Sequence, residues 1–161
     1  MRPVLFGIAA LAMMQANVAF GQAAEACGIS EELLLHCTLD NGTRQLGLCL
    51  SGNRVSYAFG PDFTAPELTM LRDLTKIEYH PFAWASRTIF ESVTLMNADT
   101  SYEIWSSAER HIPEGQTEGG VIVTLPNAEP RHFHCDQGSV WPPDPIDGLG
   151  LLNTVVPGAD G

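Results

Sequence analysis

The sequence predicts an all-β fold, a single small antiparallel sandwich or barrel of about seven or eight short strands that is stapled by disulfides. Three observations lead to this prediction. Apolar and polar residues alternate over several short segments, as in half-buried strands. Turn residues separate these segments at short intervals, and no segment after the N-terminal one carries a convincing helical period. Such a pattern is typical of β-sandwiches and small barrels.

Two tight turns define the first three strands. Asn41-Gly42 is the strongest two-residue hairpin signal, and Gly52-Asn53 is the second turn. With these turns Leu35 faces Leu48, and Leu48 faces Tyr57 on the next strand. The same rule gives four further pairs, Leu33 with Leu50, Cys37 with Leu46, Leu50 with Val55 and Leu46 with Phe59. A slip of one residue would break this shared apolar face, so we expect a three-stranded meander.

The middle of the chain contains a second hairpin. Residues 66–71 form a further strand or a short irregular stretch, and residues 76–86, with Pro81 and several aromatic residues, are expected to be a loop. Residues 88–96 and 101–107 alternate on either side of a turn at Asn97-Ala98-Asp99. The hairpin therefore supplies two of the longer strands.

The last third of the chain changes in character. Residues 109–120 are expected to form a polar loop, whereas residues 121–125 and 133–135 alternate as strands. Trp141-Pro142-Pro143-Asp144-Pro145 excludes ordinary ladder pairing. We therefore expect a β domain over residues 23–138 and a Pro/Gly-rich acidic C-terminal tail over residues 139–161. One alternative places a helical turn at residues 31–36, after Ser30 as N-cap.

The first 22 residues or so resemble a secretory signal peptide. Arg2 precedes a run of apolar or small residues from 3 to 14, and small residues follow. Cleavage is expected after Gly21 or Ala23. A transmembrane anchor needs about 20 apolar residues, and this run is interrupted by Gln15 and Asn17. A lipoprotein is disfavoured because Ala24-Glu25-Ala26 before Cys27 places an acid in the cleavage motif. A periplasmic or secreted location is expected, with no membrane span after cleavage.

Charge narrows the classes of partner. Removing Arg2 leaves seven basic residues against 19 acidic ones, a net charge near −12. Such a field repels phosphate backbones, so nucleic-acid binding is not expected, and it disfavours anionic membranes. A cationic protein is the partner that this charge favours. Composition says nothing about the oligomeric state.

All four cysteines lie in the expected mature part, which suggests two disulfides in an exported domain. Their spacing matches no zinc pattern, and three connectivities are possible. Cys37 belongs to the buried face of its strand and Cys49 to the opposite face, so joining them needs a bulge at Gly47. Cys135 alternates with Phe133 on a buried face. The register thus favours Cys37–Cys135 with Cys27–Cys49.

Several motifs resemble those of a group of functionally uncharacterised small secreted bacterial proteins. The shared pattern runs from Cys37-Thr-Leu-Asp-Asn-Gly-Thr through Leu48-Cys49 and Val55-Ser-Tyr-Ala-Phe-Gly-Pro61 to Pro66-Glu-Leu68, and continues at Gly119-Gly-Val-Ile-Val123 and Cys135-Asp136. It spans most of residues 37–136. The motif consists of turn glycines, core aromatics and disulfide cysteines, so the resemblance implies a fold and no activity.

A second segment, Ser51-Gly52-Asn53-Arg54-Val55-Ser56-Tyr57, is similar to the Ser-Gly loop near a Tyr in periplasmic lysozyme inhibitors, which are small exported β proteins. Its spacing departs from theirs, and the register above places Tyr57 in the core. The resemblance implies Ser51 and Arg54 as candidate binding residues on the second turn.

One cluster of side chains and one single residue could carry chemistry. His132, His134 and Asp136 point to one side of an extended strand, where two imidazoles and a carboxylate could hold a metal; a polar solvent face is the alternative. Glu91 alternates with Ile89 and Val93, and an inward carboxylate there would carry a raised pKa. Pairing with Arg87 or an outward bulge is its alternative.

No nucleophile motif and no phosphate-cradling loop is present, so no cofactor is expected and the chain is predicted not to be an enzyme. The leading hypothesis is an exported, non-catalytic β domain that binds something, in one version as an acidic inhibitor of a cationic cell-wall hydrolase. The alternative is a small hydrolase or metal-binding protein that uses the histidines.

Overall fold

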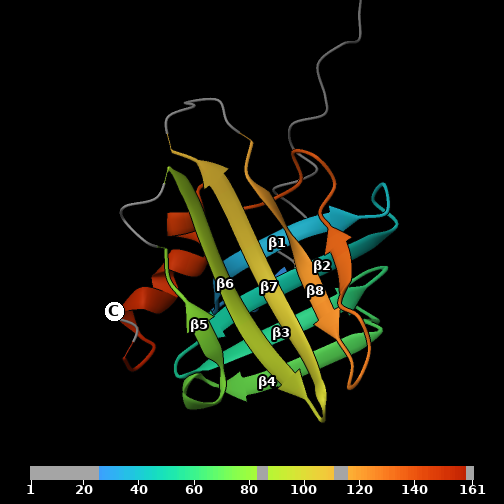
Figure 1. Cartoon of the computed structure of the whole chain (residues 1–161), viewed down its shortest axis with the longest axis horizontal. Coiled ribbons are helices and arrows are strands. Elements are labelled where there is room, and N and C mark those ends of the chain that lie inside the picture. Colours follow the sequence, from blue (N-terminus) through green and yellow to red (C-terminus); the bar gives the residue numbers. More distant parts are fainter. Residues whose placement is uncertain (1–25, 83–86, 111–115, 159–161) are drawn as a thin grey trace, which may run out of the picture.

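Two antiparallel sheets pack face to face, with their strands crossing, and enclose the core (Figure 1). The computed structural model describes residues 26–82, 87–110 and 116–158. The expected signal peptide lies outside these residues. The first sheet contains β1 (Glu32–Leu39), β2 (Arg44–Ser51), β3 (Arg54–Gly60) and β4 (Leu68–Asp73). The second contains β5 (Glu78–His80), β6 (Thr88–Asn97), β7 (Thr100–Glu109), β8 (Glu118–Thr124) and β9 (Arg131–His134). The predicted all-β class is confirmed.

Both sheets are simple meanders, in the orders β1-β2-β3-β4 and β5-β6-β7-β8-β9. The predicted pairing of β2 with β3 is confirmed at all three positions, and Leu35 and Cys37 pair with Leu48 and Leu46. At the first turn Asn41 and Gly42 both have positive φ, 57° and 80°, which Asn and Gly tolerate best.

One predicted pair is wrong. Leu33 lies opposite Cys49 and not Leu50, because the register of β1 shifts between Leu33 and Leu35. This bulge falls at Leu34. The extra residue allows Leu34 and Leu35 to be buried together, each 1% exposed, which strict alternation forbids.

The middle of the chain is more regular than its composition suggests. The stretch expected to be a loop, residues 76–86, contains strand β5, and η1 (Leu74–Lys76), a short 3-10 helix, ends at its first residue. β5 is an edge strand of three residues that ends before Pro81, so the proline costs the ladder nothing. The hairpin of β6 and β7 has its turn at Ala98 and Asp99, as predicted.

The segment from residue 139 to 158 is not a tail. It forms η2 (Pro145–Asp147) and η3 (Leu149–Thr154), two 3-10 helices that lie against β1 and β6 at the edge of the sandwich (Figure 1). Leu149 and Leu152 are fully buried in the core cluster. Trp141 exchanges two backbone hydrogen bonds with His36, of 2.7 and 2.8 Å. The apolar residues among the prolines and glycines therefore complete the core.

The two disulfides join Cys37 to Cys135 and Cys27 to Cys49, the connectivity that the strand register favours. Cys37–Cys135 ties the inner face of β1 to the end of β9 across 98 residues of sequence. Cys27–Cys49 holds the start of the described chain on the outer face of β2, where it keeps Cys49 buried. Native disulfides of small secreted domains typically contribute about 2–5 kcal/mol each.

Within the described residues, no helix has the length and apolar character needed to cross a membrane.

The packing of η3 is testable by truncating one side chain. Leu149→Ala should lower the free energy of unfolding by about 2–5 kcal/mol, because it leaves a cavity in a fully buried position. Val155→Ala, in the same segment but 39% exposed, is the control and should change stability by less than about 0.5 kcal/mol. Urea unfolding followed by tryptophan fluorescence measures both. Equal, small effects would mean that this segment does not complete the core.

Candidate functional site

An open cleft of about 400 Å³ lies between the two sheets, on the side away from η2 and η3. Its walls are inward-facing side chains from both sheets: Arg44, Tyr57, Phe59, Glu67, Leu68, Tyr102, Val121, Val123, Leu125, Arg131 and Phe133. They come from the beginnings of β2, β4 and β7, the end of β3, and strands β8 and β9. The alternation of each strand directs these residues inward. Ligand sites are commonly concave, mainly apolar and of this size.

The floor of the cleft is aromatic and aliphatic. Tyr57 and Val121 are almost fully buried, 2% and 1% exposed, and the rings of Tyr57 and Tyr102 are 6.1 Å apart. Burial, and next the nearby Tyr102, raises the pKa of Tyr57 well above its ordinary value, so its phenol stays neutral at any physiological pH. Leu125 at the mouth is 41% exposed. The floor therefore offers apolar contact.

The charges lie on the rim. Arg44 is 3.8 Å from a carboxylate oxygen of Glu67 and 3.7 Å from one of Asp40, and its guanidinium lies 5.6 Å from the centre of the Phe59 ring. Arg131 shares the inner side of β9 with Phe133, and no carboxylate of the described residues lies within ion-pair distance of it. The rim thus has one compensated and one uncompensated cation.

The predicted metal cluster is not assembled. His132 and His134 stand on the outer side of β9 with their rings stacked, 6.4 Å between centres. Asp136 lies past the strand and accepts hydrogen bonds from the backbone N–H groups of Asn41 (2.9 Å) and Gly42 (2.8 Å). Partial burial works to raise the pKa of Asp136, but these bonds and one from Thr38 outweigh it and hold the pKa below its ordinary value. Asp136 therefore fastens the first turn to β9.

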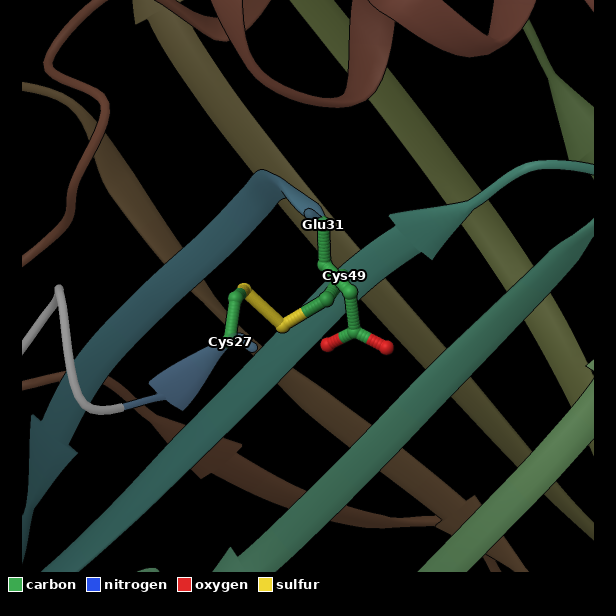
Figure 2. Close-up of side chains that lie close together, drawn as sticks. All are labelled: Cys27, Glu31 and Cys49. Carbon is green, nitrogen blue, oxygen red and sulfur yellow. A yellow bond between two sulfur atoms is a disulfide. The ribbon is translucent and has the colours of Figure 1, made fainter. Parts of the chain in front are cut away.

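Among the described residues, one group of three potential metal donors lies within 4.8 Å of one another: Cys27, Glu31 and Cys49 (Figure 2). Both sulfurs belong to the disulfide, so neither is a thiolate that could bind a metal. The Glu31 carboxylate accepts a hydrogen bond from the backbone N–H of Gly28, at 2.9 Å. This group is structural.

The other predicted positions are separate from the cleft. Ser51 and Arg54 pair at the ends of β2 and β3, next to the exposed turn at Gly52-Asn53. Trp105 packs on the outer face of the second sheet between Phe90 and His134, with ring centres 6.1 and 5.7 Å away. Tyr102 lines the cleft, together with Tyr57, Phe59 and Phe133.

Glu91 points inward, as its alternation with Ile89 and Val93 predicts, and is 4% exposed. Its Oε1 is 3.4 Å from the Tyr79 hydroxyl, which donates to it, and Oε2 has no hydrogen-bond partner among the described residues. Gly150 of η3 covers the carboxyl so closely that a Cβ at this position would lie 3.3 Å from both oxygens. The cleft and Glu91 are thus separate features.

Burial raises the pKa of Glu91 to about 7. The Phe82 N–H and the Tyr79 hydroxyl oppose this shift, and Asp144 adds to it. Such a pKa suits an acid–base catalyst, but the linings of the inter-sheet cleft and of a second hollow beside Cys135 do not include Glu91. Its carboxyl is a buried acid that η3 covers.

Comparison of the chain with protein-family models, with curated proteins and with solved structures finds no match. The function must therefore be argued from the geometry of the molecule itself.

The pKa of Glu91 predicts how stability depends on pH. Because the folded-state pKa lies above the value of about 4.5 in the unfolded chain, the folded protein binds the extra proton between these two values. The free energy of unfolding should then fall as pH rises from 5 to 8, by about 2 kcal/mol after allowance for solvent near the site.

Glu91→Gln is the matched variant, because its amide keeps the shape and does not titrate. Urea unfolding at pH 5 and pH 8 should show the decrease in the native chain and lose it in the variant. Burial lowers the pKa of His36, which works in the opposite direction, but this contribution is the same in both proteins and cancels in the difference. Parallel pH profiles would contradict a buried, raised-pKa carboxyl.

Proposed function

We propose that this protein is an exported, non-catalytic binding protein whose ligand enters the cleft between the two sheets. The observation that carries the proposal is the cleft itself: apolar side chains from two sheets, including the half-exposed Leu125, face a space of about 400 Å³. Folded proteins bury such side chains where they can, and an open apolar concavity with a few polar groups at its rim is typical of ligand sites.

Export is part of the same proposal. Two disulfides suit an oxidising compartment, where such bonds persist. The pattern of the first 22 residues, a charge followed by an apolar run and small residues, supports the same location. A periplasmic or secreted protein of this kind meets its ligand outside the cytoplasm.

Binding in the cleft can be tested with a neutral apolar fluorophore such as N-phenyl-1-naphthylamine. The native protein should bind one equivalent saturably. Val123→Trp should weaken binding at least tenfold, because the indole fills the space between the sheets. Ile122→Trp adds the same bulk one residue away, on the outer face of β8, and should leave affinity unchanged.

Near-UV circular dichroism of both variants checks that the sandwich is intact. The proposal would be contradicted if the native protein showed no saturable binding, or if the two tryptophan substitutions weakened binding equally.

A second candidate is inhibition of a cationic cell-wall hydrolase by the turn between β2 and β3. Gly52 and Asn53 are exposed at its tip, yet the Asn53 carbonyl accepts a 2.9 Å hydrogen bond from the N–H of Leu74. The turn is thus tied to the start of η1 as well as to its own hairpin. The net charge of −11 would steer a basic enzyme toward the protein, and a rigid loop would supply the specificity that charge alone lacks.

Lysozyme activity measured with excess protein tests this candidate. Activity should fall at low salt and recover as salt screens the charges. Ser51→Ala with Arg54→Ala should abolish inhibition. Thr69→Ala with Lys76→Ala also removes one hydroxyl and one positive charge, from other exposed positions, and should leave inhibition intact. Full lysozyme activity at low salt, with several types of the enzyme, would remove this candidate.

A further inference from the structure

We infer that the ligand of the inter-sheet cleft is a single-chain amphiphile with an anionic head, and that Arg131 binds the head. This inference rests on the proposed binding function and specifies the chemistry of its ligand. Three features of the cleft lead to it: the separation of apolar and charged groups, the sign of the uncompensated charge, and the size of the space.

The lining is divided in the way that an amphiphile requires. The apolar members, among them Phe59, Val123 and Phe133, lie on both inner faces. Of the charged members, Arg44 and Arg131 are the first residues of β2 and β9, and Glu67 directly precedes β4. The apolar chain of the ligand would displace water from the apolar side chains. Its head would remain at the rim, in contact with the charged side chains and with solvent. A wholly polar ligand would leave the aromatic floor unused.

The ion pairs of the cleft indicate the sign of the charge on the head of the ligand. The chain has 19 acidic and eight basic residues, so a basic side chain has many potential partners. Arg44 uses two of them, Asp40 and Glu67. Arg131 at the opposite side of the rim has no carboxylate within ion-pair distance among the described residues. A guanidinium offers a planar pair of donors to a carboxylate or phosphate. An anionic head therefore finds its partner at Arg131.

The size limits the chain. A space of about 400 Å³ lies toward the small end of ligand pockets, which span about 300–1,000 Å³. One alkyl chain fits such a space, whereas the paired chains of a diacyl lipid need the larger part of the range. Because the cleft is open, a chain longer than the apolar walls extends into water, and its extra methylenes add nothing to affinity.

Isothermal titration calorimetry of the full mature protein with alkyl carboxylates, each below its micellar concentration, tests these points. From octanoate upward, affinity should rise about fourfold for each added methylene and then stop rising when the walls are covered. Decanoate should bind at least tenfold more tightly than decanol, the neutral compound of equal chain length. Decyl phosphate shows whether a phosphate head is preferred to a carboxylate.

Matched variants test whether Arg131 binds the head of the ligand. Arg131→Gln should weaken decanoate at least tenfold and leave decanol unchanged. Arg54→Gln removes an exposed arginine remote from the cleft and should affect neither. Equal thermal midpoints and near-UV spectra show that the fold is retained.

The outcomes separate the two proposals. If decanol binds as well as decanoate and Arg131→Gln has no effect, the anionic head is wrong while the binding function stands. Tighter binding of decylamine than of decanoate would assign the head to Glu67 and overturn the inference in the same way. If no chain binds and none displaces the neutral fluorophore, and the fluorophore itself does not bind, both proposals fail.

Discussion

Two twisted sheets whose strands cross can cover each other fully only where they overlap, and the rest of this structure depends on that constraint. Away from the overlap, inward-facing side chains need another cover or remain open to solvent. On one side of the molecule η2 and η3 supply the cover, with Leu149 and Leu152 inserted beside β1 and β6. On the other side the described chain supplies none, and the cleft results.

The register of the first sheet could be predicted because two independent turns specify it. Asn41-Gly42 and Gly52-Asn53 place the same leucines on one face. The bulge at Leu34 is the feature of this register that the turns do not predict. β1, the strand that carries this bulge, packs against η3, more than 100 residues away. Leu149 and Leu152 were themselves missed, because prolines and glycines interrupt any periodic signal in this segment. When a strand is covered by a distant, irregular segment, the residues of that strand carry no pattern that predicts the covering segment.

The candidate site was less predictable than the fold. Alternation alone placed Glu91 inward, and the same argument would have placed Arg131 on the side of Phe133. Phe59, Tyr57 and Phe133 carry the pattern of core residues, and nothing in that pattern distinguishes a packed core from the wall of a cleft. The difference lies in how far the sheets overlap. Asp136 shows the converse: a residue grouped with two histidines by spacing instead holds a turn 94 residues away through backbone N–H groups.

The position of η3 at the end of the described chain determines when the core can close. Cys37 cannot form its disulfide until Cys135, 98 residues later, has been synthesised. Leu149 and Leu152, which belong to the same core cluster, follow later still. Contacts this distant repay their loop-closure entropy only at the end of folding. A chain that emerges from synthesis with its N-terminus first must therefore carry uncovered aliphatic surface until the segment of η3 follows. A product interrupted before Leu149 keeps that surface permanently, which marks it for proteases that degrade unfinished proteins.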